Sequence, residues 1–132
     1  MQESQKNAAE WLAQERAALD RWGRGDPSGY LEISHPEVSY FDPFEEKRID
    51  GLDHLREYYA PLKGTIRVDR DDIVEPRVQT IGDVAILTFK YYSQTGNDVL
   101  RWNCTEVYAR QSDRWAIVHT HWSLNARNTE PW

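Results

Sequence analysis

The sequence predicts an α+β fold: one cone-shaped, curved antiparallel sheet that is closed by three N-terminal helices. Two observations lead to this fold class. In two segments of the first half of the chain, apolar residues recur at intervals of three and four, the period of an amphipathic helix. In the second half they alternate with polar residues, and turn-forming residues divide four long stretches, as in an antiparallel meander.

The first helix is expected over residues 3–22, and its stripe of helically spaced residues contains one charged member, Glu15. Two glycines and a proline within residues 23–27 end it, and Asp26 can cap a short second helix over residues 28–33. The full stripe comprises Ala8, Trp11, Leu12, Glu15, Ala18, Leu19 and Trp22.

A first strand is expected over residues 38–44, which are rich in β-branched and aromatic side chains, followed by a turn or loop over residues 45–50. The third helix is expected over residues 51–62, because apolar residues return there at helical spacing. The meander is then predicted to consist of strands at about 66–80, 83–94, 99–111 and 114–125.

Length and composition restrict the class of protein. The 132 residues predict one domain, 1–132, with a core of about 8–125 and flexible ends. The net charge of −6 argues against nucleic acid as a partner, and no stretch approaches the roughly 18 to 20 apolar residues that a membrane span needs. The N-terminus lacks the apolar core of a signal peptide, so we expect a cytoplasmic protein. The single cysteine, Cys104, forms neither an internal disulfide nor a structural zinc site by itself.

Four stretches resemble the nuclear transport factor 2-like superfamily, in its SnoaL-like branch close to the calcium/calmodulin-dependent protein kinase II association domain. They are residues 41–44 (FDPF), 50–59 (DGLDHLREYY), 76–83 (PRVQTIGD) and 115–123 (WAIVHTHWS). The resemblance implies a cystatin-like α+β roll with a pocket inside. Because this superfamily includes isomerases, hydrolases, binding modules and oligomerisation hubs, the fold alone does not name the chemistry.

Asp42 is the first candidate catalytic residue. The resemblance implies that it occupies the place where ketosteroid isomerases carry a proton-shuttling aspartate, a role that needs a carboxylate in an apolar pocket. The helix position that would supply the partner tyrosine is Ala18, which departs from that pattern. Asp42 could instead be a carboxylate that caps a turn, since Asp-Pro commonly marks turns.

Glu106 is the second candidate catalytic residue, and a strand's period of two places it on one face with Trp102, Cys104 and Tyr108. The resemblance implies that this face points inward, that pocket arginines of the kinase domain correspond to Tyr92, Glu106 and Trp122, and that Tyr30 matches a pocket tyrosine. A carboxylate between aromatics suggests a neutral or cationic ligand. We therefore expect a ligand cavity with Asp42 near its mouth; the alternatives are a structurally paired Glu106 and aromatics that fill the core. The cavity would be lined by Tyr30, Tyr92, Trp102, Glu106 and Trp122.

His119 and His121 share a strand face, but two imidazoles do not make a metal site, and we expect none. The resemblance implies that this outer face packs against a second subunit. The expected homodimer interface contains Leu87, Phe89, Trp115, His119 and His121. No phosphate-binding glycine motif occurs in its required context, so no cofactor is expected.

The leading hypothesis is a small-molecule-binding protein for a small, mostly apolar ligand, with proton transfer by Glu106 or Asp42 if it is an enzyme. The alternative is a non-catalytic association module, and a steroid-type isomerase is the third hypothesis. These assignments depend on strand register, because a slip of one residue exchanges the inward and outward side chains.

Overall fold

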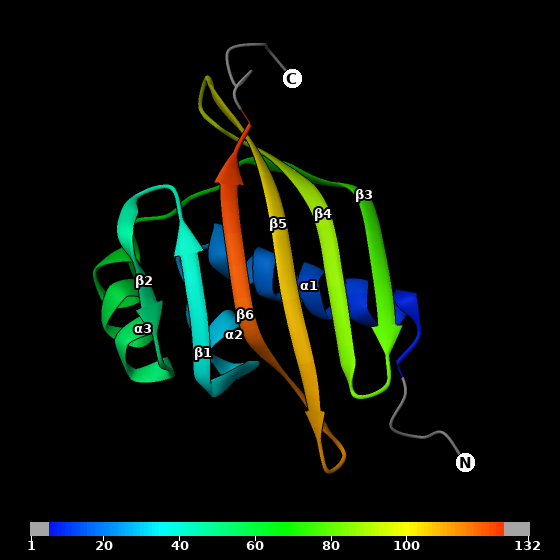
Figure 1. Cartoon of the computed structure of the whole chain (residues 1–132). Helices are drawn as coiled ribbons and strands as arrows, with labels where there is room; N and C mark the ends of the chain where they lie inside the picture. Colours follow the sequence, from blue (N-terminus) through cyan, green and yellow to red (C-terminus); the bar gives the residue numbers. More distant parts are fainter. Residues whose placement is uncertain (1–5, 126–132) are drawn as a thin grey trace.

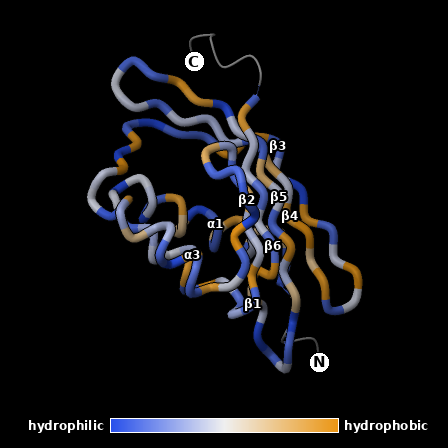
Figure 2. The backbone as a smooth tube through the Cα atoms, turned by 60° about the vertical axis from the view of Figure 1, so that its left-hand side comes forward, coloured by the Kyte–Doolittle hydropathy of each residue, from blue (hydrophilic) through white to orange (hydrophobic). Residues whose placement is uncertain are grey.

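The computed structural model describes residues 6–125. Six strands form one curved, unclosed sheet in the order β2-β1-β6-β5-β4-β3, and the helices lie on its concave side (Figures 1 and 2). This is the predicted α+β class. The helical elements are α1 (Ala8–Gly23), α2 (Ser28–Glu32), α3 (Leu52–Tyr59) and the 3-10 turn η1 (Ala60–Leu62). The strands are β1 (Ser34–Asp42), β2 (Glu45–Asp50), β3 (Arg70–Ile81), β4 (Val84–Thr95), β5 (Asp98–Gln111) and β6 (Arg114–Leu124).

Helix α1 starts at a capping box, in which the Asn7 side chain accepts the Glu10 N–H and the Glu10 carboxylate accepts the Asn7 N–H. Its buried face carries Trp11, Glu15 and Leu19 against the sheet. The predicted stripe is confirmed from Trp11 onward, whereas Ala8 is exposed and the helix begins there instead of at residue 3. Residues 3–5 of the predicted helix and most of both ends expected to be flexible lie outside the described residues.

Residues 45–50, expected as a loop, form strand β2, which pairs antiparallel with β1 in a hairpin. The turn is closed by Asp42, whose Oδ1 accepts the N–H groups of Phe44 (2.9 Å) and Glu45 (3.0 Å). Strand β2 lies at the sheet edge and is mostly charged, which hides its signal in a hydrophobicity pattern. Strand β1 begins at Ser34, earlier than expected, because it pairs in parallel with β6; the sheet is otherwise antiparallel.

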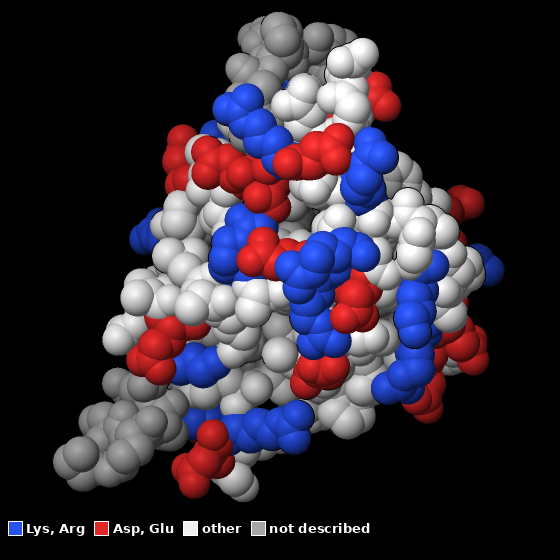
Figure 3. Space-filling view, turned by 180° about the vertical axis from the view of Figure 1, so that it is seen from behind, with Lys and Arg blue, Asp and Glu red and all other residues white. Residues whose placement is uncertain are grey.

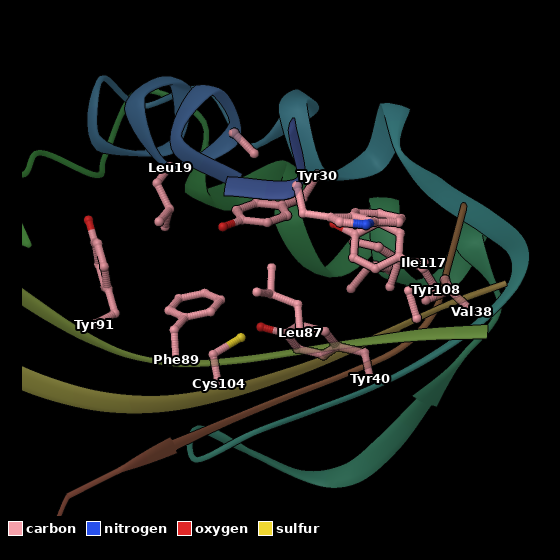
Figure 4. Close-up of a cluster of buried hydrophobic side chains, with 14 of the residues drawn as sticks. Leu19, Tyr30, Val38, Tyr40, Leu87, Phe89, Tyr91, Cys104, Tyr108 and Ile117 are labelled. Carbon is pink, nitrogen blue, oxygen red and sulfur yellow. The ribbon is translucent and has the colours of Figure 1, made fainter. Parts of the chain in front are cut away.

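Strands β3 to β6 form the predicted meander, but the inward side of β4 differs from the expectation. Leu87 pairs with Glu106 and Phe89 with Cys104, so Leu87 and Phe89 point toward the helices and are 1% and 4% exposed (Figure 4). Placing them on the outer face was wrong. Both faces of β4 carry apolar residues, so their alternation did not fix which set faces inward.

A β-bulge in the β5–β6 pair corrects the place of Trp115. Val107 pairs with His119 and Tyr108 with Ile117, so Val118 is the extra residue. Beyond it, Trp115 turns inward and its ring meets Trp11 of α1 with centroids 5.3 Å apart. His119 and His121 remain on the outer face, as expected, while Trp115 does not share it.

The helix-bearing side of the molecule displays mixed charges (Figure 3). Arg21 of α1, for example, pairs with both Asp26 and Glu32. Within residues 6–125, no helix is long and apolar enough to cross a membrane.

Candidate functional site

A cavity of about 410 Å³ lies between the helices and the inner face of the sheet. Half of the residues that line it are aromatic, and Asp42 is the one carboxylate among them. The wall consists of Leu19, Trp22, Tyr30, Tyr40, Asp42, Phe44, Tyr58, Tyr59, Leu62, Ile66, Arg67, Val68, Tyr91, Ser93, Thr95, Leu100, Trp102 and Trp122.

The sheet side of the cavity is a continuous row of four rings, here called the sheet row: Phe44, Trp102, Trp122 and Tyr91. Neighbouring centroids are 5.8 Å apart for Phe44 and Trp102, 5.9 Å for Trp102 and Trp122, and 6.0 Å for Trp122 and Tyr91. Each pair is close to perpendicular, an arrangement that aromatic rings prefer.

The opposite side is a second row, here called the helix row: Tyr40, Tyr58, Tyr59, Trp22 and Tyr30. Tyr40 and Tyr59 are 5.7 Å apart, Trp22 and Tyr59 5.1 Å, and Trp22 and Tyr30 6.1 Å. The two rows come from α1, α2, α3, the β1–β2 hairpin and the three central strands β4, β5 and β6, so the wall exists only in the folded chain.

Asp42 lies at the end of β1 and accepts four hydrogen bonds. Its Oδ2 accepts the hydroxyls of Tyr40 (2.9 Å) and Tyr58 (2.8 Å), in addition to the two backbone N–H groups at Oδ1. A carboxylate has about four lone-pair sites, so all of them are occupied. Among residues 6–125, no Lys, Arg or His forms an ion pair with it.

Two more tyrosines of the wall also donate to carboxylates. The Tyr91 hydroxyl donates to Asp71 Oδ2 at 2.6 Å, and Arg16 pairs with the same carboxylate. The Tyr30 hydroxyl donates to Glu15. Burial, followed by these neighbouring carboxylates, raises the pKa of Tyr30 and Tyr91, so both hydroxyls keep their protons.

Glu106 forms a buried pair with Glu15 behind Tyr30, and both residues are 0% exposed. The two carboxyl groups are close enough to hydrogen-bond to each other. The Tyr108 hydroxyl donates to Glu106 Oε1 at 3.2 Å, and the Cys104 thiol lies 3.9 Å from Oε2. Neither carboxyl lines the cavity, whereas Tyr30, whose hydroxyl donates to Glu15, does.

The electrostatics of this pair require a shared proton. Burial raises the pKa of both carboxyls, and the charge of Glu15 raises that of Glu106 further. Glu15 Oε1 has no other hydrogen-bond partner in the described chain. A proton retained on Glu106 relieves the repulsion, since two charged carboxylates cannot share a dry site.

The structure brings together four of the residues expected at the cavity: Tyr30, Asp42, Trp102 and Trp122. Glu106 lies behind the wall, and Tyr92 lies on the outer face, where the Arg101 guanidinium is 5.3 Å from its ring centroid. The expected position of Tyr92 in the wall was wrong because both faces of β4 carry apolar residues, so the alternation did not show which set faces inward. Whether any of these residues binds or acts on a ligand stays a prediction.

Sequence reasoning missed Glu15 and the tyrosines that hold Asp42. The signal for Glu15 was present, because it is the charged member of an otherwise apolar stripe. Tyr58 and Tyr59 were expected only as apolar helix positions. In residues 6–125, no group of three or more His, Cys, Asp or Glu side chains is arranged to hold a metal ion.

Comparison with solved structures supports the fold. A Parabacteroides distasonis protein, named a "putative ketosteroid isomerase", is 37% identical with a TM-score of 0.83, over 96% of this chain and 95% of that one. The S. rosetta CaMKII hub is 23% identical with a TM-score of 0.73, over 92% and 98% of the two chains. The C. elegans CaMKII association domain is 21% identical with a TM-score of 0.72, over 87% and 93%.

A search of curated proteins finds no match. The family profile of the calcium/calmodulin dependent protein kinase II association domain matches residues 7–126, nearly the whole chain. The chain therefore belongs to the calcium/calmodulin-dependent protein kinase II association domain family, and it shares its fold with nuclear transport factor 2-like proteins.

Proposed function

We propose that this protein binds a small, mostly apolar molecule in the cavity between its two aromatic rows. The observation that carries the proposal is that the hydroxyls of Tyr58 and Tyr91 are fixed to Asp42 and Asp71, which holds these rings at the wall. The rings of Tyr58 and Tyr91 are therefore held at the wall and do not fill the cavity. The volume of about 410 Å³ lies within the usual range for small-molecule sites, about 300–1,000 Å³.

Catalysis is a separate question, and binding is the better-supported function. The similarity to the Parabacteroides distasonis protein favours an isomerase that moves a proton at a carbon next to a ketone, with Asp42 or Glu106 as the acid or base. However, all lone pairs of Asp42 are occupied, and Glu106 lies behind Tyr30. A proton-transfer role for Asp42 requires that purified protein isomerise an unsaturated ketone and that Asp42→Asn abolish the turnover; undiminished turnover in this variant would exclude Asp42.

Binding is tested with the neutral fluorescent probe N-phenyl-1-naphthylamine. We expect its emission to rise on titration with the protein, since the probe enters an apolar site. Ser93 lines the cavity, so Ser93→Phe should fill it and abolish the rise. Gln94→Phe adds the same ring to the opposite face of β4 and serves as the control. Equal binding by both variants, or none by the natural sequence, would contradict the proposal.

Self-association is the second candidate function, favoured by the family and by the outer face of the sheet. Phe41 and Val107 lie there beside His119 and His121; the Phe41 and His121 rings are 5.1 Å apart. Because Leu87, Phe89 and Trp115 point inward, the proposed interface consists of the outer-face residues Phe41, Val107, His119 and His121.

The expected cytoplasmic location stays a prediction.

The assembly is measured by size-exclusion chromatography with light scattering. We expect a dimer for the natural sequence, and Val107→Asp should dissociate it because a charge is costly to bury at an interface. Ala9→Asp adds the same charge to an exposed position of α1 and should leave the mass unchanged. A monomeric natural protein would exclude this interface.

A further inference from the structure

We propose that the cavity takes an organic cation whose charge is spread over carbon, such as a quaternary ammonium group on an apolar body. This inference rests on the proposed binding function and names the chemical class of its ligand. Three features of the wall carry it: an unpaired negative charge, hydroxyls that offer only acceptors, and aromatic faces on both sides.

The unpaired charge is that of Asp42. This carboxylate lines the cavity, and no basic side chain of residues 6–125 forms an ion pair with it. Its four hydrogen bonds, from Tyr40, Tyr58 and two backbone N–H groups, occupy its lone pairs. Asp42 can therefore attract a ligand by charge but has no lone pair left for a ligand N–H. This suits a cation that carries no N–H.

The hydroxyls of four wall tyrosines are directed at carboxylates: Tyr40 and Tyr58 at Asp42, Tyr91 at Asp71 and Tyr30 at Glu15. A phenol has a single proton, so each of these groups can offer a ligand only oxygen lone pairs. These four hydroxyls therefore offer no donor to a carboxylate or phosphate, which needs donors.

Arg67 is the one basic residue among those that line the cavity in the described chain. Its guanidinium pairs with Asp69 at 2.9 Å, and its side chain is 69% exposed. The Arg67 side chain therefore lies toward solvent, where Asp69 balances its charge, and it does not neutralise Asp42.

The aromatic rows supply the remaining attraction. A cation is drawn to the face of an aromatic ring within about 6 Å of the centroid, most strongly for Trp and when water is excluded. Trp102 and Trp122 of the sheet strands line the cavity, as do Trp22, Tyr58 and Tyr59 of the helices. A ligand between the rows contacts rings on two sides and lies beside a carboxylate, the combination that recognises a quaternary ammonium.

The test compares three probes. Phenyltrimethylammonium is the cation, tert-butylbenzene is its uncharged carbon isostere of the same shape, and phenylacetate is an anion of similar size. Each competes with N-phenyl-1-naphthylamine for the natural protein. We expect the cation to bind at least about tenfold tighter than the isostere and the anion to bind weakest. An isostere or anion that binds as tightly as the cation would overturn the inference but leave cavity binding intact. Failure of N-phenyl-1-naphthylamine itself to bind would instead refute the proposed function.

Asp42→Asn removes the charge at nearly constant shape. The cation should lose about tenfold in affinity while the isostere changes less than about twofold, and retained isostere binding shows that the cavity is intact. Asp53→Asn removes an equal charge from an exposed position on α3 and should leave the cation's affinity unchanged. Equal losses in the two variants would mean that only net charge matters and would refute the assigned site. If Asp42→Asn does not fold, the probe comparison on the natural protein decides the inference.

Discussion

The buried carboxyl pair predicts how stability depends on pH, and Glu106→Gln is the substitution that reveals it. Burial and the charge of Glu15 raise the pKa of Glu106 well above its ordinary value of 4.5, so the folded protein retains a proton that the unfolded chain releases. Stability from this group is complete below the unfolded pKa and is lost as pH rises toward the folded pKa. An amide at this position mimics the protonated acid: its NH2 can donate to Glu15, and its oxygen can accept from Tyr108.

The magnitude follows from one proton. Between the unfolded and folded pKa values of Glu106, the natural protein loses about 1.4 kcal/mol of unfolding free energy per pH unit relative to Glu106→Gln. The variant should match the natural protein below pH 4.5 and become progressively more stable above it. With a urea m-value of about 1–3 kcal/mol/M, each pH unit shifts the relative midpoint by roughly 0.5–1.4 M.

The assay is urea unfolding followed by tryptophan fluorescence, at fixed protein concentration, in steps of half a pH unit from pH 4 to pH 8. The exposed Glu57→Gln is the matched control and should stay parallel to the natural protein. The reasoning is refuted if Glu106→Gln also stays parallel, or if it becomes the less stable protein as pH rises, because Glu106 would then be charged in the fold.

Three further predictions use the same unfolding assay at one pH. Leu87→Ala should cost about 2–5 kcal/mol, because the side chain is fully buried opposite Glu106; a loss under 1 kcal/mol would place Leu87 on the surface instead. Gly25→Ala should cost about 1–3 kcal/mol, since Gly25 has φ +87° and a Cβ there would lie 3.1 Å from Gly64 Cα; an unchanged midpoint would contradict this close approach. Asn7→Ala should cost about 1 kcal/mol by removing the cap of α1, and Asn7→Asp should restore most of it.

The helices and the order of elements could be predicted because their signals are local. The stripe of α1 and its capping residues lie within one stretch of chain, and turns at Gly82, Gly96 and Ser112 divide the long strands. The candidate site was only partly accessible. Glu106 was correctly expected on the inner face, but its partner Glu15 lies on a helix 91 positions earlier by their numbering, and no local pattern pairs the two.

Strand register was the part that local patterns could not decide. Both faces of β4 are apolar, so the pairing of Leu87 with Glu106 depends on β5, and the inward turn of Trp115 depends on a bulge beside His119. Strand β2 exists because β1 offers it a free edge, and Asp42 at the cavity wall accepts a hydrogen bond from Tyr58 of α3, a residue distant in sequence.

The sequence by itself determined the α+β class, the presence and order of its three helices, the four-strand meander and the family. The tertiary structure alone decided which side chains meet: the two aromatic rows, the occupied lone pairs of Asp42 and the buried pair of Glu15 and Glu106. The physical reason is that propensity and periodicity act over a few residues, whereas pairing register, bulges and the desolvation of a carboxyl are set by segments that are distant in the chain.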